Sequence, residues 1–343
     1  MKIRKTLCFD DVLLVPAFSD ITSRKEIDLS SSLDESYSLS LPVISSPMDT
    51  VTETKMAAAM SSLGGLGIIH RYNSIKEQGY LVSEVANHPF QKFNGKIAAA
   101  VGVSGDYLER TSHLVSCGAE IICIDIAHGH HALMRHAIRV LRNTLGTKIH
   151  IMAGNVATID GYNDLADWGA DSVRVGIGGG SICSTRVKTG HGVPTLQSII
   201  DCSASDRDVP IIADGGIRTS GDIVKALAAG ADFVMLGSLL AGTNESPGEE
   251  VFLDGEKLKE YRGMASVEAQ IQWRGHTSSV EGVSSFVPVK GPVELTLSGL
   301  ETGIRSGLSY TGARSINELH AKAKFISQTS AGAVESSTHI NKM

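Results

Sequence analysis

Residues 172–186 read Ser-Val-Arg-Val-Gly-Ile-Gly-Gly-Gly-Ser-Ile-Cys-Ser-Thr-Arg, a short apolar strand followed by a glycine-rich turn and a cysteine. Glycine permits positive φ angles and lets a ligand approach the backbone closely. The thiol of Cys183 is therefore a candidate nucleophile. The hydroxyl of Thr185 and the cations Arg186 and Lys188 suit a cysteine that ionises and exchanges protons. The stretch predicts a reactive loop directly after a strand.

Short apolar runs with polar or glycine-rich ends recur along the whole chain. Eight of them are predicted strands: 41–46, 65–70, 96–103, 120–127, 149–156, 172–177, 210–215 and 233–238. Helix-like stretches lie between most of them, among them 53–61, 75–85, 106–117, 131–144 and 221–229. Apolar strands that alternate with helices indicate a parallel sheet covered on both faces. We therefore predict an α/β fold, a single-domain (β/α)8 TIM barrel over residues 1–343 with a short N-terminal arm and a C-terminal tail.

The ends of the predicted strands indicate where the active site lies. In barrels of this kind the site gathers at the C-terminal ends of the strands. Polar and glycine residues occupy nearly all of these ends, at 46–49, 70–71, 125–128, 154–155, 178–183, 214–216 and 237–238. The last two stretches follow strands seven and eight, where backbone N–H groups and a serine hydroxyl can hold a phosphate.

Composition and charge exclude several classes of protein. The chain of 343 residues has a net charge of −6, so nothing favours nucleic acid or an anionic membrane as a partner. No apolar run approaches the roughly 18 residues of a membrane-spanning helix. The five cysteines are Cys8, Cys117, Cys123, Cys183 and Cys202, with no CxxC pair. Scattered unpaired cysteines indicate a cytoplasmic protein without a zinc cluster.

The chain resembles the IMP dehydrogenase/GMP reductase family over almost its full length. The shared segments are FDDVLLVP at 9–16, SPMDTV at 46–51, AGNV at 153–156, GSIC at 180–183, DGGI at 214–217, MLGS at 235–238 and YRGM at 261–264. The resemblance implies that Cys183 forms a thioimidate with C2 of a purine ribonucleotide and that a nicotinamide cofactor exchanges hydride there. It also implies a homotetramer.

The resemblance assigns further residues to ligands. Those implied for the nucleotide are Ser46, Met48, Asn155, Ser181, Asp214, Gly215, Gly216, Gly237, Ser238, Tyr261, Gly263, Met264 and Gly282. Those implied for the cofactor are Ser23, Arg24, Arg71, Asp125, Ile126, Ala127, Ile177, Gly178 and Ser306. A monovalent cation, K⁺, is expected at Gly178, Gly180, Cys183 and Arg186, although Gly179 stands where the family usually has Pro or Ser.

Three features favour reduction of GMP to IMP and ammonia with NADPH. Residues 71–95 leave no room for the CBS pair that typical dehydrogenases insert between strands two and three. Residues 263–281 are too short for the dehydrogenase flap, whose Arg-Tyr pair activates water, and Arg274 is a poor substitute. Thr185 and Glu281 occupy the positions with which reductases deliver a proton to departing ammonia, so we expect all three of Cys183, Thr185 and Glu281 to be catalytic.

Other features favour the alternative, a dehydrogenase without CBS domains that oxidises IMP to XMP with NAD. Ser238 and the tail at 334–339 resemble the dehydrogenases, and Ser278 and Val280 replace the residues that read the guanine amino group in reductases. A remoter alternative is a non-catalytic nucleotide-binding barrel, which would not need Cys183 and Glu281 together. A flavin-dependent α-hydroxy-acid oxidase would share the barrel but leave the cysteine loop unexplained. We expect the reductase.

Overall fold

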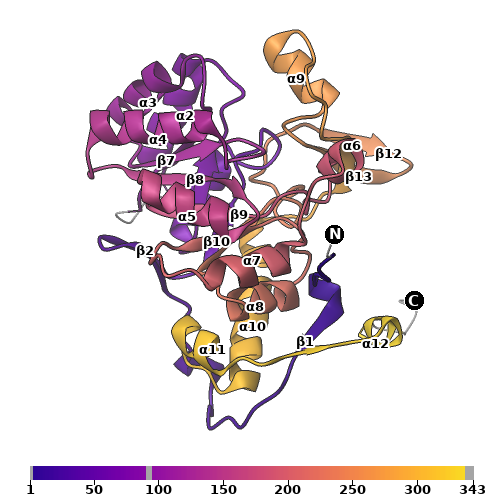
Figure 1. The fold of residues 1–343 in the computed structure, drawn as a ribbon. Coiled ribbons are helices and arrows are strands. Elements are labelled where there is room, and N and C mark those ends of the chain that lie inside the picture. Colours follow the sequence, from indigo (N-terminus) through magenta and orange to yellow (C-terminus); the bar gives the residue numbers. More distant parts are fainter. Residues whose placement is uncertain (1–2, 90–94, 337–343) are drawn as a thin grey trace.

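A closed barrel of eight parallel strands forms the centre of the computed structural model, which describes residues 3–89 and 95–336 (Figure 1). The strands are β4 (Val43–Ser45), β5 (Leu66–Ile69), β6 (Ala98–Val101), β7 (Ile121–Asp125), β8 (His150–Val156), β9 (Ser172–Val175), β10 (Ile211–Asp214) and β11 (Phe233–Leu236). Pairing of β11 with β4 closes the ring. Each strand lies within its predicted range, so the (β/α)8 prediction is confirmed.

Helices cover the outside of the barrel, as the alternation of segments predicts. Those between the strands are α1 (Thr54–Ser62), α2 (Ile75–Ala86), α3 (Tyr107–Ser116), α4 (Ala132–Leu145), α5 (Ile159–Trp168), α7 (Thr195–Ser203) and α8 (Ser220–Ala228). The short helix α6 (Thr185–Thr189) directly follows the cysteine and lies apart from the barrel wall (Figure 1). Several begin at a capping side chain; the hydroxyl of Thr219, for example, accepts the N–H of Asp222 and fixes the start of α8. Outward-facing strand residues such as Val173 and Val175 pack in the core shared with these helices.

A second apolar cluster fills the inside of the barrel. It contains Ile44, Ile68, Ile121, Met152, Ile212 and Phe233 from six different strands. The antiparallel hairpin of β2 (Ser31–Asp34) and β3 (Tyr37–Leu39) contributes Leu33 and Leu39 to the same cluster. Asp34 of the hairpin lies 3.0 Å from His150, the first residue of β8, so the hairpin closes the N-terminal end of the barrel. The sequence analysis did not predict it, because its strands are short and half polar.

The N-terminal arm and the C-terminal tail pair with each other. After the 3₁₀ turn η1 (Phe9–Asp11), β1 (Val12–Leu14) pairs antiparallel with β15 (Phe325–Ser327). Before β15 come α10 (Val293–Thr311) and α11 (Ile316–Lys322), and α12 (Ser330–Glu335) follows it. Of the tail at 334–339, residues 337–339 lie outside the described residues. Among the residues that the structure does describe, no helix has the length and apolar character needed to span a membrane.

A three-stranded antiparallel sheet follows β11 and lies beside the cysteine loop. Its strands are β12 (Glu250–Leu253), β13 (Glu256–Arg262) and β14 (Ser284–Pro288), and α9 (Val267–Arg274) is inserted between the last two. In Figure 1 the orange α9 stands at one end of the molecule, while α10 and α11 lie toward the other. The connector at 263–281 thus projects from this sheet.

Candidate active site

A cavity of about 310 Å³ opens at the C-terminal ends of the barrel strands. Cys183, Thr185 and Glu281, the residues predicted to be catalytic, all line it. Every residue predicted to bind the nucleotide lines it as well, from Ser46 after β4 to Gly282 before β14. The size lies at the lower end of the range for small-molecule sites. Seven strand ends and the connector therefore build one pocket.

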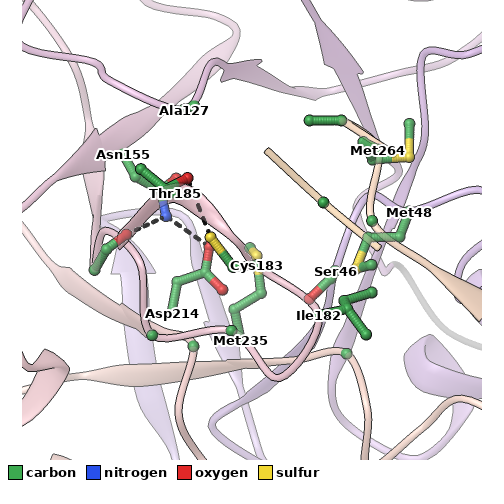
Figure 2. A pocket seen from close by; sticks show the side chains of 18 of the residues that line it. Ser46, Met48, Ala127, Asn155, Ile182, Cys183, Thr185, Asp214, Met235 and Met264 are labelled. Atoms are coloured by element: carbon green, nitrogen blue, oxygen red, sulfur yellow. Dashed lines mark hydrogen bonds between the residues drawn. The ribbon is translucent and has the colours of Figure 1, made fainter. Parts of the chain in front are cut away.

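Hydrogen bonds join the three predicted catalytic residues in a row. The Cys183 sulfur lies 3.2 Å from the Thr185 hydroxyl oxygen. That hydroxyl donates to Oε2 of Glu281 at 2.7 Å, although the two residues are 96 positions apart in the chain. Figure 2 shows Thr185 next to the cysteine sulfur. Because a hydroxyl can accept from the thiol while it donates to the carboxylate, the row is a continuous path for a proton.

Backbone hydrogen bonds hold the segment that carries Glu281 against the cysteine loop. The Ser184 N–H donates to the carbonyl of Glu281 at 2.8 Å, and the Val283 N–H donates to Ile182 at 3.1 Å. Cys183 and Gly282 form an isolated β-bridge. The Glu281 side chain is thus placed by a two-stranded contact, and the printed sequence gives no hint of this pairing.

The ends of β10 and β11 meet the glycine-rich turn where a phosphate site is predicted. Gly215 and Gly216 have φ angles of +92° and +79°, which favour glycine. A Cβ atom on Gly215 would lie 3.0 Å from the amide nitrogen of Gly180. A Cβ atom on Gly237 would lie 2.9 Å from the Tyr261 hydroxyl oxygen, so this close approach also requires glycine.

Three hydroxyl groups gather around these glycines. Burial raises the pKa of Tyr261, and hydrogen bonds with Ser181 and Ser238 act against that rise. Hydroxyl groups and backbone N–H groups at the C-terminal end of a barrel are the donors that a phosphate requires. The structure therefore brings together Ser181, Ser238 and Tyr261 from three distant segments.

Arg174, which the sequence analysis did not single out, links two acidic residues of the cavity wall. It lies on β9, is 5% exposed, and donates to Asp125 at 2.6 Å and to Asp214 at 2.8 Å. The Asn155 amide also donates to Asp214 at 2.8 Å, as Figure 2 shows. Burial alone would raise the pKa of Asp125, but Arg174 and Arg71 outweigh it and hold that pKa below its usual value.

A signal for Arg174 is present in the sequence. In the stretch Ser172-Val173-Arg174-Val175 polar and apolar residues alternate, so both polar side chains face the inside of the barrel. A cation inside a barrel needs carboxylate partners, and here those partners are the predicted ligand residues Asp125 and Asp214. The alternation would have marked Arg174 as part of the site.

The residues predicted for the cofactor divide into two groups. Arg71, Asp125, Ile126, Ala127, Ile177 and Gly178 line the same cavity as Cys183. Ser23, Arg24 and Ser306 do not line it. Ser23 caps the 3₁₀ turn η2 (Arg24–Glu26), which packs against α10, the helix that carries Ser306. Within one chain, the structure does not bring these three residues to the cavity.

The predicted cation site draws on the backbone of the cysteine loop. Gly178, Gly180 and Cys183 line the cavity, whereas Arg186 does not. Two of the carbonyl oxygens predicted to bind the cation already accept one hydrogen bond each. The Gly180 carbonyl accepts from the Cys183 N–H and the Arg186 carbonyl from the Gly190 N–H, both at 3.1 Å. Each carbonyl oxygen retains a second lone pair, so the donor set fits a weakly held monovalent cation. No cluster of His, Cys, Asp and Glu suited to a metal ion occurs in the ranges 3–89 and 95–336.

The helix α9 is attached to the barrel by an aromatic stack. The rings of Tyr72 and Trp273 lie 4.4 Å apart with an angle of 7° between their planes. The guanidinium of Arg274 lies 4.5 Å from the centre of the Trp273 ring. Tyr72 lines the cavity, but Arg274 does not. Arg274 therefore does not reach the region of Cys183.

Comparison with known proteins gives a consistent result. The family model described as "IMP dehydrogenase / GMP reductase domain" matches residues 6–339. The inosine-5′-monophosphate dehydrogenase of Cryptosporidium parvum is 39% identical, over 98% of this chain and 96% of that protein. The GMP reductase of Leishmania major is 33% identical, over 97% and 96%. A crystal structure of a cysteine-to-alanine variant of Trypanosoma brucei GMP reductase with guanosine 5′-monophosphate has a TM-score of 0.93, 32% identity and 99% coverage of both chains.

Proposed function

Because the chain belongs to the IMP dehydrogenase/GMP reductase family, an oxidoreductase family of purine nucleotide metabolism, we propose that it converts GMP to IMP and ammonia with NADPH. The observation that carries this proposal is the row of Cys183, Thr185 and Glu281. The carboxylate of Glu281 can take up the thiol proton and later return it to the 2-amino group, which suits a reaction in which an amine must leave.

In the first step, Cys183 is the nucleophile and Glu281 the proton store. The thiol proton passes through Thr185 to Glu281, and the sulfur then forms a bond to C2 of GMP. Glu281 returns the proton through Thr185 to the 2-amino group, the C2–N bond breaks, and ammonia leaves with its electron pair. The product of this step is a thioimidate between Cys183 and C2.

The second step needs a hydride, which NADPH supplies to C2 when it is bound. The C2–S bond then breaks, and the sulfur leaves as the thiolate with its electron pair to release IMP. Arg71, Asp125 and Ala127 would hold the cofactor, because they line the cavity that contains Cys183.

The phosphate and the ribose of the substrate have separate partners in this proposal. Ser181, Ser238 and Tyr261, with the N–H groups of Gly215 and Gly216, would bind the 5′-phosphate. Asp214 would accept hydrogen bonds from the ribose hydroxyls. Arg174 and Asn155 donate to its carboxylate and hold it in place. GMP as substrate is supported by the similar T. brucei GMP reductase, which was solved with guanosine 5′-monophosphate.

The connector supports reduction over oxidation of the purine. An IMP dehydrogenase must hydrolyse its thioimidate, which needs an activated water. The connector lacks an Arg-Tyr pair, and Arg274 lies on the Trp273 ring outside the cavity. Loss of a general base would slow hydrolysis by about 10²–10⁴-fold.

A second candidate is IMP oxidation with NAD by a dehydrogenase without CBS domains. Two observations favour it: Ser238 is the residue that the dehydrogenases carry, and identity to the C. parvum dehydrogenase reaches 39%. In this reaction Cys183 forms the same thioimidate. The two candidate functions therefore differ in whether water or a hydride then attacks C2.

Four further properties belong to the proposal. They are a bound monovalent cation at the backbone carbonyls of the cysteine loop, a homotetramer, residues 1–343 acting as one catalytic domain, and a cytoplasmic location. The location is supported by free cysteines, since Cys8, Cys117, Cys123, Cys183 and Cys202 form no disulfide in the described residues.

A paired assay tests the function. Purified protein is given GMP with NADPH, or IMP with NAD⁺, and nicotinamide absorbance is followed while ammonia is measured. We expect NADPH oxidation with an equal amount of ammonia, and loss of both in the Cys183→Ala variant. Turnover of IMP and NAD⁺ alone would refute the reductase and favour the second candidate.

A further inference from the structure

One buried side chain ties the two ends of the connector together. Gln270 lies on α9 and is 2% exposed, although the connector projects from the sheet. Its amide nitrogen donates to the carbonyl of Ala265 at 3.0 Å and to the carbonyl of Ser279 at 3.0 Å. Its amide oxygen accepts the Ser278 N–H at 2.8 Å and the Ser278 hydroxyl at 3.1 Å. All hydrogen-bonding positions of the amide are thus used.

These contacts lie directly beside the segment that carries Glu281. The carbonyl of Ala265, which accepts from Gln270, also accepts the N–H of Glu281 at 3.2 Å. Ser278 and Ser279 immediately precede that segment in the chain. Gln270 therefore holds the strand-like stretch before Glu281 on one side, and the Ser184 N–H holds the Glu281 carbonyl on the other.

Among the described side chains, only Gln270 donates hydrogen bonds to both Ala265 and Ser279. The Tyr72–Trp273 stack attaches the outer side of α9 to the barrel but touches neither end of the connector. Gln272, two residues from Gln270 and exposed, accepts instead from Arg262 at 2.6 Å. The inner contact is thus specific to the amide of Gln270.

From this arrangement we propose that Gln270 is a positioning residue, which keeps the Glu281 carboxylate on the Thr185 hydroxyl. Without the amide, water would replace its four hydrogen bonds, because the connector is at the surface. The loop would then open at its neck, and the 2.7 Å contact between Thr185 and Glu281 would be populated only part of the time. The inference rests on the proposed function only through the role of Glu281 as proton store.

A double-mutant cycle tests the inference. Gln270→Met keeps the size of the side chain and removes its polar atoms, and Gln272→Met is the matched control on the same helix. Each is made in the wild-type chain and with Glu281→Gln, and is assayed with whichever substrate pair the wild type turns over. We expect Gln270→Met to lower kcat about tenfold with KM for the nucleotide within twofold, and to have no further effect when Glu281 is already glutamine. Gln272→Met should change kcat less than twofold.

Amide hydrogen exchange supplies a readout that does not depend on turnover. The Ser184 and Glu281 amides should exchange at least tenfold faster in Gln270→Met and at the wild-type rate in Gln272→Met. An equal loss of kcat in both backgrounds, or unchanged exchange at these amides, would overturn the inference. If the protein turns over only IMP with NAD⁺, the proposed reductase function is refuted. The double-mutant cycle, measured with IMP and NAD⁺, then still decides whether Gln270 and Glu281 are coupled.

Discussion

The two ends of the barrel each hold a row of three hydrogen-bonded polar residues. At the C-terminal end, Cys183, Thr185 and Glu281 line a cavity. At the N-terminal end, the Ser172 hydroxyl lies 2.8 Å from Nε2 of His150, and Nδ1 of His150 lies 3.0 Å from Asp34. The second row has the residue types of a hydrolase triad.

Access distinguishes the two rows. Ser172 is 0% exposed and His150 is 4% exposed, because the β2–β3 hairpin that carries Asp34 covers them. Lys96 lies 3.4 Å from Asp34 and balances its charge. Residue types and hydrogen bonds alone therefore do not make an active site; a cavity in which substrate can reach the nucleophile is also required. We expect the N-terminal row to affect stability and the C-terminal row to affect turnover.

The largest effect is expected for the nucleophile. Cys183→Ala should lower kcat by at least about 10⁴-fold, since the thioimidate can no longer form. The melting temperature should stay within about 2 °C, because only a sulfur atom at a cavity wall is lost. Cys117→Ala is the control, and it should keep full activity. Substantial turnover by Cys183→Ala would contradict the assignment of turnover to the C-terminal row.

A smaller loss is expected for the proton store. Glu281→Gln should lower kcat about 100-fold at neutral pH, since the amide still accepts from Thr185 but cannot take up the thiol proton. Glu268→Gln is the control, because Glu268 is exposed and its carboxylate accepts a hydrogen bond from Ser284, away from the cavity. Steady-state kinetics with saturating nucleotide and cofactor measures both. A Glu281→Gln enzyme with wild-type kcat would exclude the proposed proton path.

At the N-terminal end the expected effect is on stability. Leu33→Ala removes a fully buried side chain from the barrel interior and should lower the free energy of unfolding by about 2–5 kcal/mol. The kcat per folded molecule should be unchanged, because Leu33 lies at the opposite end from the cavity. Urea denaturation and active-site titration give the two values, with the exposed Ser32→Ala as control. A fall in kcat as large as that for Glu281→Gln would contradict the comparison.

The smallest effect is a pH dependence of stability at the same end. Burial lowers the pKa of His150 below its usual 6.5, so the unfolded chain binds its proton more readily than the folded one. Stability from this residue is therefore complete above pH 6.5 and is lost as the pH falls below it. In His150→Gln, the decline in unfolding free energy between pH 7 and 5 should be shallower. Urea titrations at four pH values measure this decline in both proteins. Equal declines in the wild type and in His150→Gln would contradict the proposed contribution of His150.

The neighbouring Asp34 acts in a lower pH range. Burial alone would raise its pKa, but hydrogen bonds from Ser36 and His150 lower it from 3.8 to about 2. Its contribution is present above pH 3.8 and is lost as the pH falls toward 2. The pH window from 7 to 5 therefore separates the effect of His150 from that of Asp34.

Much of the fold was predictable from local patterns. The eight strands and the helices between them follow from apolar runs of the right length, and each observed strand lies inside its predicted range. The pairing of β1 with β15 was not predicted, because it depends on a partner far away in the chain. The β2–β3 hairpin and the three-stranded sheet that carries the connector were missed because their strands are short or largely polar.

For the site, strand-end positions and the family resemblance together named most of the residues that line the cavity. Cys183, Asp214 and Ser238 were identified from the sequence and line the cavity. Arg174 was missed although the alternation in residues 172–175 marks it as facing the inside of the barrel. Gln270 was missed because its role comes from contacts that no local pattern reveals. Ser23, Arg24 and Ser306 were expected at the site and lie elsewhere in the single chain.

The sequence by itself determined the barrel, the family and a cysteine that is a candidate nucleophile, because alternating apolar segments and short motifs are local and carry their own physical signal. Only the tertiary structure decided what surrounds that cysteine. The hydrogen bond between Thr185 and Glu281 joins residues 96 positions apart, and Gln270 supports it from a third segment. Such contacts depend on the placement of whole elements in space, so they become visible only after the chain has folded.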